Sequence, residues 1–500
     1  MPKTPEYFFL DPLSQETLQQ QIQRFMCEAI LAGRFLPGER LPSSRKLADH
    51  LGVSRITVTL AYSELVANDF VAPRGRSGYY VSQKAPRQVS FQPRAESHPG
   101  GVDWSRAIGQ RYSEQVLPAK PQHWRDYRYR FIYGQSDDGL FDHRNWRRCA
   151  IQALGKRDFA STSADYFERD DAELIKYIAL HTLPNRGIQA RPEEILITLG
   201  AQNALWLAAQ VLLNQRRTAA MDDPGYHGLR AILKHTRCEL VTNAVDGRGT
   251  VFENLPERTN VLFVTPSHHC PTNATMPVER RSELLQHARL NDYLIVEDDY
   301  EFEMSFLQPP APAIKSLDRD GRVIYVGSFS KSIFPGLRLG YLVGPQPFIK
   351  EVRALRAAVL RHPPGQLQRT VATFLALGYY DALIARMTNA YRERRAAMEA
   401  AIARTGLKKV DNIVSGGSSF WMEAPAHVDT RKLAADLGSK GVLIEPGYTF
   451  FQNEASACNF YRLAYSSIEP SLIGRGIELV AEAIADYVPE TQAGLEPEPA

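Results

Sequence analysis

Cysteine is scarce in this chain of 500 residues, and the five cysteines are scattered: Cys27, Cys149, Cys238, Cys270 and Cys458. No two of them form a C-x-x-C pair. A disulfide framework needs an even, closely placed set, and a structural zinc site needs clustered ligands. The Ser-His-His-Cys run at 267–270 offers adjacent ligand types without further clustered partners. We therefore expect reduced cysteines and no bound metal.

Long hydrophobic runs are also lacking. No apolar run approaches the roughly 18 residues that a membrane span requires, and residues 1–12 lack the apolar stretch of a secretion signal. Hydrophobic residues make up 44% and charged residues 23% of the chain, values ordinary for a soluble protein. A chain of 500 residues is too long for one compact core. We expect a cytoplasmic protein of at least two domains with no membrane partner.

Positive charge is concentrated near the N-terminus. The whole chain has a net charge of only +3, but the segment from Arg34 to Arg87 carries nine Lys or Arg against four Asp or Glu. A local excess of this kind attracts a phosphate backbone, although a solvated basic face would have the same charge.

The same segment predicts a helix-turn-helix followed by a β-hairpin. Apolar residues from Gln15 to Leu31 recur at helical spacing, and two shorter helices follow, to about Leu51 and to about Asn68. Residues 70–82 contain two β-prone stretches around a turn, which predicts a β-hairpin that forms a wing. The expected caps and stops are Gly33 for the first helix, Ser43 or Ser44 and then Gly52 for the second, and Ser54 for the third.

In a helix-turn-helix the N-terminal residues of the third helix face base edges in the major groove. The candidates for base contact are Ser54, Arg55, Thr57 and Thr59, and the candidates for phosphate or an adjacent groove are Arg45, Arg74 and Gly75. Arg55 is the best candidate for a bidentate contact to guanine, although it would also serve simply to solvate a helix end. The apolar residues Ile56, Val58, Ala61 and Leu65 are expected in the core. The stretch from about Leu13 to Val81 resembles the winged helix-turn-helix of GntR-type regulators, and LPSSRKLADHLGVSR (41–55) is a specific match.

Composition divides the chain into a winged helix-turn-helix domain at 1–82, a linker at 83–126 and an α/β domain at 127–490. The linker is rich in Pro, Gln, Ser, Arg and Gly, with short helical pieces expected near Trp104. Beyond it, β-branched runs alternate with helical patterns, which predicts a doubly wound sheet whose ligands gather at the C-terminal ends of its strands. The clearest of these runs are 194–200, 260–266, 293–299 and 322–328.

Several polar residues of the α/β domain suit pyridoxal phosphate, which needs a lysine, a carboxylate for its pyridine nitrogen, an aromatic face and donors for its phosphate. Lys331 follows a strand and lies among Ser328, Ser330 and Ser332. Asp298 ends a predicted buried strand, where a carboxylate is costly unless it meets a cation. The remaining candidates are Tyr300 for the phenolate oxygen, the helix start at GAQNA (200–204) for the phosphate, and Tyr226 for stacking, unless Tyr226 is a core tyrosine.

The motifs from Phe131 to Tyr465 resemble fold-type-I aminotransferases, and with the N-terminal module the chain resembles the MocR subfamily of GntR regulators. The resemblance implies an internal aldimine at Lys331, with Asp298 at the pyridine nitrogen and Tyr300 at the phenolate oxygen. It also implies a head-to-tail homodimer and a substrate-carboxylate clamp at Arg462. The implied phosphate ligands are Ser328, Ser330, Arg338, Ala201 and Gln202.

Two segments depart from the aminotransferase pattern. Cys270-Pro271-Thr272-Asn273 stands where aminotransferases commonly carry N-P-T-G, so the contact to the ring oxygen must be altered. The usual Y-G-D-P-x-G segment is missing, since Tyr166 is followed by FERDDAELIKYI.

The sequence supports a leading hypothesis and two alternatives. The leading one is a regulator that binds double-stranded operator DNA, holds pyridoxal phosphate, and senses a small amine or amino acid by transaldimination at Lys331. The first alternative is an active aminotransferase with a non-essential N-terminal domain, and the second is a regulator that responds to pyridoxal phosphate itself. We expect a sensor rather than an enzyme, with residual transaminase activity left open.

Overall fold

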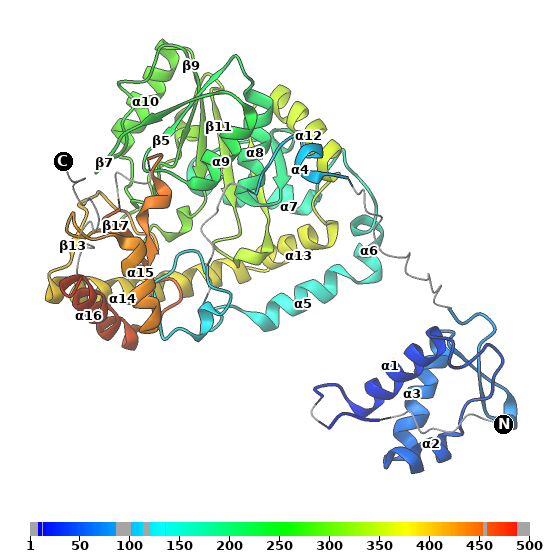
Figure 1. Cartoon of the computed structure of the whole chain (residues 1–500). Helices are drawn as coiled ribbons and strands as arrows, with labels where there is room; N and C mark the ends of the chain where they lie inside the picture. The colour runs from blue at the N-terminus through cyan, green and yellow to red at the C-terminus, as the bar shows by residue number, and fades with distance from the viewer. Residues whose placement is uncertain are drawn as a thin grey trace. The chain divides into compact units, whose positions relative to one another are not determined.

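The structure is a computed structural model that describes residues 9–12, 14–86, 102–113, 120–135, 137–453 and 458–487. The chain forms two compact units, Met1–Arg111 and Tyr112–Ala500 (Figure 1). Of the segment predicted as a linker, residues 87–101 and 114–119 lie outside the described residues. The helical piece expected near Trp104 is present as α4 (Trp104–Ala107).

The first unit contains the predicted helix-turn-helix and wing. Its elements are α1 (Leu18–Leu31), α2 (Ser44–Leu51), α3 (Arg55–Ala67), β1 (Val71–Pro73) and β2 (Tyr79–Val81). Ser43 and Ser54 cap α2 and α3 by accepting from backbone N–H groups, and Gly52 ends α2 with φ +64°, so the predicted caps are confirmed. Strands β1 and β2 pair antiparallel. Buried side chains from all three helices, among them Met26, Leu47 and Val58, form the core of this unit.

The second unit is built on a seven-stranded sheet with the order β4-β12-β11-β10-β9-β5-β6. Its strands are β4 (Ile195–Thr198), β5 (Thr218–Asp222), β6 (Glu239–Asn243), β9 (Thr259–Val264), β10 (Leu294–Asp299), β11 (Val323–Ser328) and β12 (Gly340–Val343). The four predicted strand runs are confirmed as β4, β9, β10 and β11. Strand β12, by contrast, runs antiparallel to both of its neighbours, β11 and β4.

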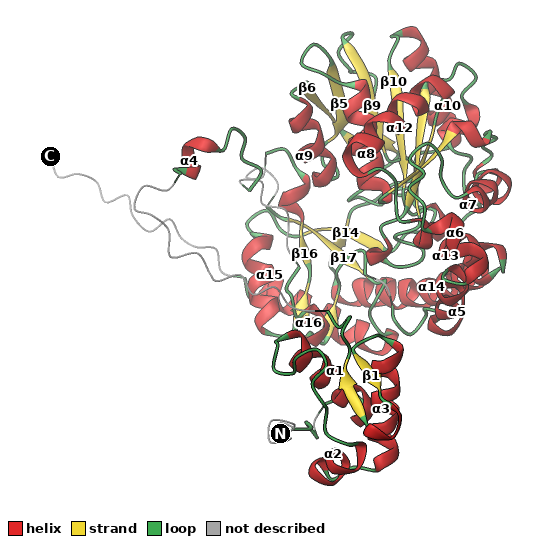
Figure 2. Ribbon diagram, turned by 90° about the vertical axis from the view of Figure 1, so that its right-hand side faces the viewer, coloured by secondary structure: helices red, strands yellow, loops and turns green. Residues whose placement is uncertain are grey.

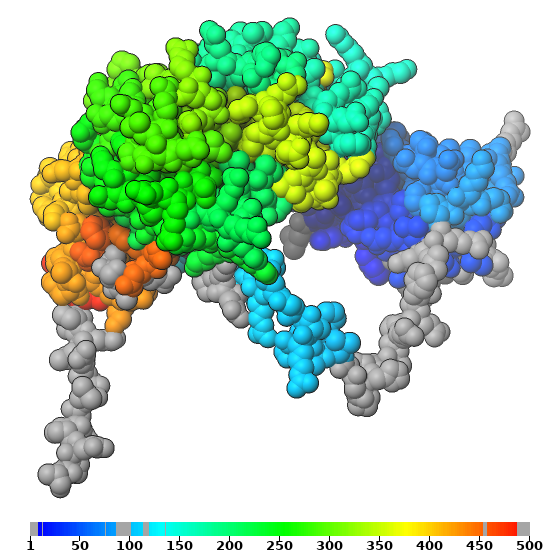
Figure 3. All heavy atoms as spheres, turned by 90° about the horizontal axis from the view of Figure 1, so that it is seen from above, coloured from blue at the N-terminus to red at the C-terminus, as the bar shows by residue number. Residues whose placement is uncertain are grey.

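Helices cover both faces of this sheet (Figure 2). Apolar side chains of α8 (Gly200–Leu212), α9 (His227–Thr236) and α12 (Gln346–Leu360) pack on one face, and those of α10 (Val278–Leu290) and α11 (Ile314–Leu317) pack on the other. Successive residues of β4 face opposite sides of the sheet. Leu196 packs in the cluster that contains α8, α9 and α12, whereas Ile195 and Ile197 pack in another cluster with α7 (Ala172–Tyr177), α13 (Gly365–Ala376), α14 (Tyr379–Thr405) and α16 (Pro470–Ala485). The space-filling view shows the green residues of the sheet region packed against the yellow-green helical residues that follow (Figure 3).

The remaining elements of the second unit are short strands and further helices. The remaining helices are α5 (His143–Ala153), α6 (Lys156–Thr162) and α15 (Thr430–Ser439). The short strands are β3 (Tyr129–Arg130), β7 (Val245–Asp246), β8 (Gly249–Thr250), β13 (Lys408–Lys409), β14 (Ser419–Glu423), β15 (Val442–Leu443), β16 (Glu445–Pro446) and β17 (Phe460–Ala464). Strands β13, β14, β17 and β16 form a second, antiparallel sheet. Within the described ranges, no helix has both the length and the apolar character that crossing a bilayer requires.

Candidate cofactor pocket and DNA-binding face

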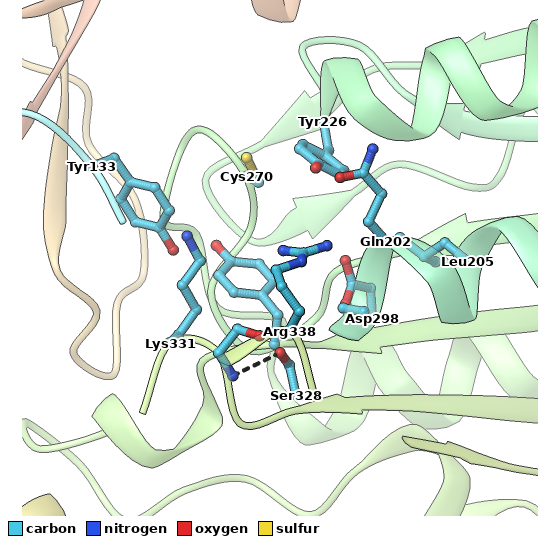
Figure 4. Close-up of a pocket in the computed structure, with 12 residues that line it drawn as sticks. Tyr133, Gln202, Leu205, Tyr226, Cys270, Asp298, Ser328, Lys331 and Arg338 are labelled. Carbon is cyan, nitrogen blue, oxygen red and sulfur yellow. Dashed lines mark hydrogen bonds between the residues drawn. The ribbon is translucent and has the colours of Figure 1, made fainter. Parts of the chain in front are cut away.

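A pocket opens at the C-terminal edge of the large sheet. Its lining consists of Tyr133, Ala201, Gln202, Leu205, Tyr226, Cys270, Asp298, Tyr300, Ser328, Ser330, Lys331 and Arg338 (Figure 4). The nine residues that the sequence suggested for cofactor binding are all among them. The structure adds Tyr133, Leu205 and Cys270, and it places Arg462 against the ring of Tyr133.

Strand direction explains why these residues meet. Strands β10 and β11 are parallel neighbours, so Asp298 and Ser328 lie close to the same edge of the sheet. Because β12 is antiparallel, its N-terminal end reaches that edge as well and brings Arg338 into the pocket. Gly200 begins α8 with φ +78°, and a Cβ there would lie 3.4 Å from the hydroxyl of Ser330. Its lack of a side chain lets the first turn of α8 approach the serine loop closely.

Lys331 presents its amine to the pocket. Its Nζ lies 4.4 Å from the centre of the Tyr133 ring, and Figure 4 shows the two side chains turned toward each other. Gly134 has φ +73°, and a Cβ on it would collide with this Nζ. Burial lowers the pKa of Lys331 below its ordinary value, although the carboxylate of Glu301 opposes this shift. A lysine of lowered pKa is more often a neutral amine, which is the nucleophilic form.

Two pocket groups have no partner within the described part of the chain: Asp298 Oδ1 and the hydroxyl of Ser330. Asp298 is only 8% exposed, and burial, reinforced by the charge of Asp299, raises its pKa to about 7. A buried carboxyl without a partner is costly, and a cation placed against it would restore its ionised form. The free hydroxyl of Ser330 suits an anion such as phosphate. The pocket therefore fits a ligand with a cationic end and an anionic end.

The aromatic residues of the pocket differ in how they are held. Tyr300 donates its hydroxyl to the carbonyl of His268 at 2.9 Å, and Tyr133 donates to Glu301 at 3.1 Å. Tyr226 lies at the start of α9, and its ring faces the same cavity as Asp298 and Gln202 (Figure 4). Its exposure is intermediate, so it is a pocket residue as well as a contact of the core.

Arg462 is held beside the pocket by four contacts. It is 3% exposed, and its guanidinium lies 4.0 Å from the centre of the Tyr133 ring and 4.8 Å from that of Phe450. Its Nη1 lies 3.7 Å from Cys270 Sγ, and its Nε and Nη2 both bind Glu445. Sequence reasoning did not find Tyr133 or Glu445. Only the cross-strand register of β16 and β17, which sets Glu445 opposite Arg462, identifies that pair.

The Cys-Pro-Thr-Asn segment keeps the backbone path that a glycine would favour. Asn273, at the position of the usual glycine, has φ +60°, and its amide donates to the carbonyls of Gly416 and Ser419 at 2.9 and 3.2 Å. These hydrogen bonds offset the strain of a left-handed residue. Cys270 lines the pocket, whereas Tyr166 is 42% exposed and outside the lining.

The first unit presents the predicted DNA-contact residues on its surface. Arg45, Ser54, Arg55, Arg74 and Gly75 are exposed, and Thr57 and Thr59 are partly exposed. Some of these groups already have partners. The hydroxyls of Ser54 and Thr57 lie 2.8 Å apart, Thr59 donates to the carbonyl of Arg55, and Arg74 stacks on Tyr80 at 4.6 Å.

The prediction for Ile56 was wrong. Val58, Ala61 and Leu65 are buried as expected, but Ile56 is 72% exposed, and Leu60 one turn later is 49% exposed. These two residues are spaced four apart on the outward face of α3, whereas the buried three occupy the inward face. An apolar side chain beside Arg55 at the start of this helix thus belongs with the candidate DNA-contact residues.

Comparison with known proteins identifies both units. Residues 18–81 match the family described as bacterial regulatory proteins, gntR family, and residues 137–476 match aminotransferase class I and II. The HTH-type transcriptional regulator TauR of Rhodobacter capsulatus is 57% identical over 481 residues, which cover 96% of this chain and 99% of that protein. The probable rhizopine catabolism regulatory protein MocR of Rhizobium meliloti is 31% identical over 387 residues, 77% of each chain.

The solved structures include LysN, α-aminoadipate aminotransferase, from Thermus thermophilus, complexed with N-(5'-phosphopyridoxyl)-L-leucine. It matches with a TM-score of 0.69 and 25% identity over 77% of this chain and 98% of that one. The predicted fold class, a winged helix-turn-helix joined to a fold-type-I aminotransferase domain, is confirmed. Such a domain implies binding of pyridoxal phosphate. The chain belongs to the MocR subfamily of GntR-type transcriptional regulators.

Proposed function

We propose that this regulator holds pyridoxal phosphate at Lys331 and responds to a small amine or amino acid that carries an acidic group. One observation carries the proposal: a lysine amine, an unpartnered buried carboxyl and an unpartnered serine hydroxyl line the same pocket in the described structure. These are the three groups that the aldehyde, the pyridine nitrogen and the phosphate of the cofactor require.

Each part of the cofactor has a residue to receive it. Asp298 would pair with the protonated pyridine nitrogen, Tyr226 would cover the ring, and Tyr300 would reach the ring oxygen. The phosphate would be held by Ser328, Ser330, Arg338 and the first turn of α8 at Ala201 and Gln202. Free backbone N–H groups of such a turn favour an anion.

The bound cofactor would supply an aldehyde carbon that condenses reversibly with a primary amine. Lys331 provides one such amine, and an effector would provide a competing one. Arg462 would bind the acidic group of the effector, since a guanidinium forms paired hydrogen bonds with carboxylate or sulfonate oxygens. Release of Lys331 would remove one tether between the serine loop and the ligand, which can bias the domain between two conformations.

Regulation by this route is tested by combining cofactor binding with DNA binding. The holoprotein is titrated with amines while its affinity for a labelled duplex from upstream of its own gene is followed by fluorescence anisotropy. We expect an acid-bearing amine to change both the cofactor absorbance and the DNA affinity over the same concentration range. Amine-induced spectral change with constant DNA affinity would contradict the proposal and favour an enzyme instead.

We propose further that α3 reads bases and that Arg45 and Arg74 bind phosphates. Arg55→Ala is expected to cost about 1–3 kcal/mol with the operator and to relax specificity at one position. Ile56→Ala should weaken the preference for one thymine, because an apolar side chain distinguishes the thymine methyl group.

Arg45→Ala and Arg74→Ala should weaken binding to operator and scrambled duplexes alike, and each should lower the slope of log affinity against log salt concentration by about 1. Anisotropy at several salt concentrations separates these outcomes, and equal losses for all four variants would contradict the assignment.

The family resemblance also supports a head-to-tail homodimer acting in the cytoplasm, where operator DNA is found. Two copies would present two α3 helices, as two-fold operators require.

A further inference from the structure

Arg462 already holds a carboxylate. Its Nε donates to Glu445 Oε2 at 2.7 Å, and its Nη2 lies 2.6 Å from the same oxygen. Strands β16 and β17 set the two residues directly opposite each other. The forked edge of the guanidinium, which would otherwise receive the acidic group of a ligand, is therefore taken by the protein's own side chain.

The other sides of this guanidinium also contact side chains, none of which is an acid. Its faces lie against the rings of Tyr133 and Phe450. Its remaining nitrogen, Nη1, points to Cys270 Sγ at 3.7 Å, and a thiol is only a weak acceptor. An acidic ligand that pairs with both Nε and Nη2 of Arg462 must take the position of Glu445.

We propose that Glu445 is an internal competitor of the effector: it occupies Arg462 until the acidic group of the effector replaces it. This inference rests on the proposed function, since it takes Arg462 to be the residue that binds the acid. An amine without an acidic group leaves the ion pair between Glu445 and Arg462 in place. An amine that carries an acidic group replaces the Glu445 carboxylate on Arg462, so the charge of Arg462 stays paired with an anion throughout.

The surroundings permit such an exchange. The Glu445 side chain is 17% exposed, whereas that of Arg462 is 4% exposed, so the carboxylate can turn toward solvent while the guanidinium stays in place. Lys120, whose ammonium donates to the carbonyl of Tyr133, lies within the electrostatic influence of Glu445 and offers it an alternative cation. Losing a buried partner without replacement would be strongly unfavourable, and replacement by the ligand avoids that cost.

The test compares Glu445→Gln with wild-type holoprotein. Two probes of equal length are used, 3-aminopropanoate with an acid and propylamine without one, and binding is read from the cofactor absorbance. Glu445→Gln should bind 3-aminopropanoate about tenfold more tightly, because the competing charged hydrogen bonds are lost. Its affinity for propylamine should not change. Glu445→Asp, which keeps the charge on a shorter arm, should fall between the two proteins. Glu423→Gln removes a glutamate of the same sheet that pairs with Lys408, and it should leave both affinities unchanged.

Equal tightening for both amines, or weaker binding of 3-aminopropanoate, would overturn the proposal and make Glu445 a structural partner of Arg462. A second readout needs no amine. Propanoate alone should raise the melting temperature of Glu445→Gln but not that of wild type, and Arg462→Lys in the Glu445→Gln background should abolish this effect. If wild type binds neither amine, amine sensing itself fails, while the propanoate experiment still decides the role of Glu445. No stabilisation of Glu445→Gln by propanoate would refute that role.

Discussion

Lys331→Ala is expected to abolish borohydride-stable attachment of pyridoxal phosphate and to remove the response of DNA binding to amines. Within the cavity described here, Lys331 is the residue whose amine faces Tyr133 and whose pKa is lowered by burial. Loss of the covalent bond should weaken cofactor retention on the order of a hundredfold, which corresponds to about 2.7 kcal/mol. The remaining affinity would come from Asp298 and the phosphate ligands. Reduction with borohydride followed by peptide mapping measures the attachment directly.

Two further lysine variants make this result specific. Lys331→Arg keeps a cation in the pocket but has no amine to condense, so it should behave like Lys331→Ala if bond formation matters and like wild type if only charge matters. Lys350→Ala removes an exposed lysine of α12 and should leave labelling unchanged. Persistence of the labelled peptide in Lys331→Ala, or an unaltered amine response in that variant, would exclude Lys331 as the attachment site.

Local sequence signals predicted the small unit well, apart from one face of α3. The capping serines and Gly52 fix where the helices begin and end. Each serine supplies a specific hydrogen bond and Gly52 supplies a left-handed backbone, and both are local properties. Ile56 was misplaced for a physical reason. Apolar residues of α3 occupy two stripes, and spacing alone does not show which stripe faces the core.

The family resemblance named other pocket residues, but the convergence of the pocket could be derived from the residues alone only where strand ends defined it. Asp298 and Ser328 lie in the last two residues of strands whose β-branched runs are evident in the sequence, so their convergence follows from parallel pairing. The direction of β12, which delivers Arg338, and the register that sets Glu445 against Arg462 are long-range properties. They depend on which strands become neighbours, and no local pattern records that choice.

The two adjacent carboxylates Asp298 and Asp299 give the last prediction, because the same isosteric change should have opposite effects at the two positions. Asp298→Asn is expected to stabilise the cofactor-free protein at pH 8. Burial raises the pKa of Asp298 to about 7 in the folded protein, against an ordinary value of 3.8. The folded state therefore binds a proton that the unfolded state releases, and stability falls as the pH rises from about 4 through 7. At pH 8 the buried charge should cost about 2–4 kcal/mol, which asparagine does not incur.

Bound cofactor should reverse the stability advantage that Asp298→Asn has at pH 8. A pyridinium nitrogen against Asp298 would offset the cost of the buried charge, so adding pyridoxal phosphate should raise the melting temperature of wild type far more than that of Asp298→Asn. Melting curves at pH 5 and pH 8, with and without cofactor, measure both effects. Near pH 5 the cofactor-free proteins should differ little, since Asp298 is then largely protonated. Two further buried carboxyls, Glu297 and Glu303, also have pKa values raised to about 7, but they are present in both proteins and cancel in the comparison.

Asp299→Asn should instead destabilise the protein by about 3–5 kcal/mol at pH 8, with or without cofactor. Burial alone would raise the pKa of Asp299, but its ion pair with Arg186 at 2.7 Å and the hydroxyl of Tyr325 at 2.8 Å hold that pKa below its ordinary value. Asparagine would leave the guanidinium of Arg186, which is 1% exposed, without its countercharge. The opposite effects of the two substitutions on stability reflect the surroundings of the two carboxylates. Asp299 has a cation supplied by the fold, and Asp298 requires one from a ligand. If Asp298→Asn destabilised the cofactor-free protein as much as Asp299→Asn, Asp298 would be a structural residue. That result would contradict the proposed pairing of Asp298 with a protonated pyridine nitrogen.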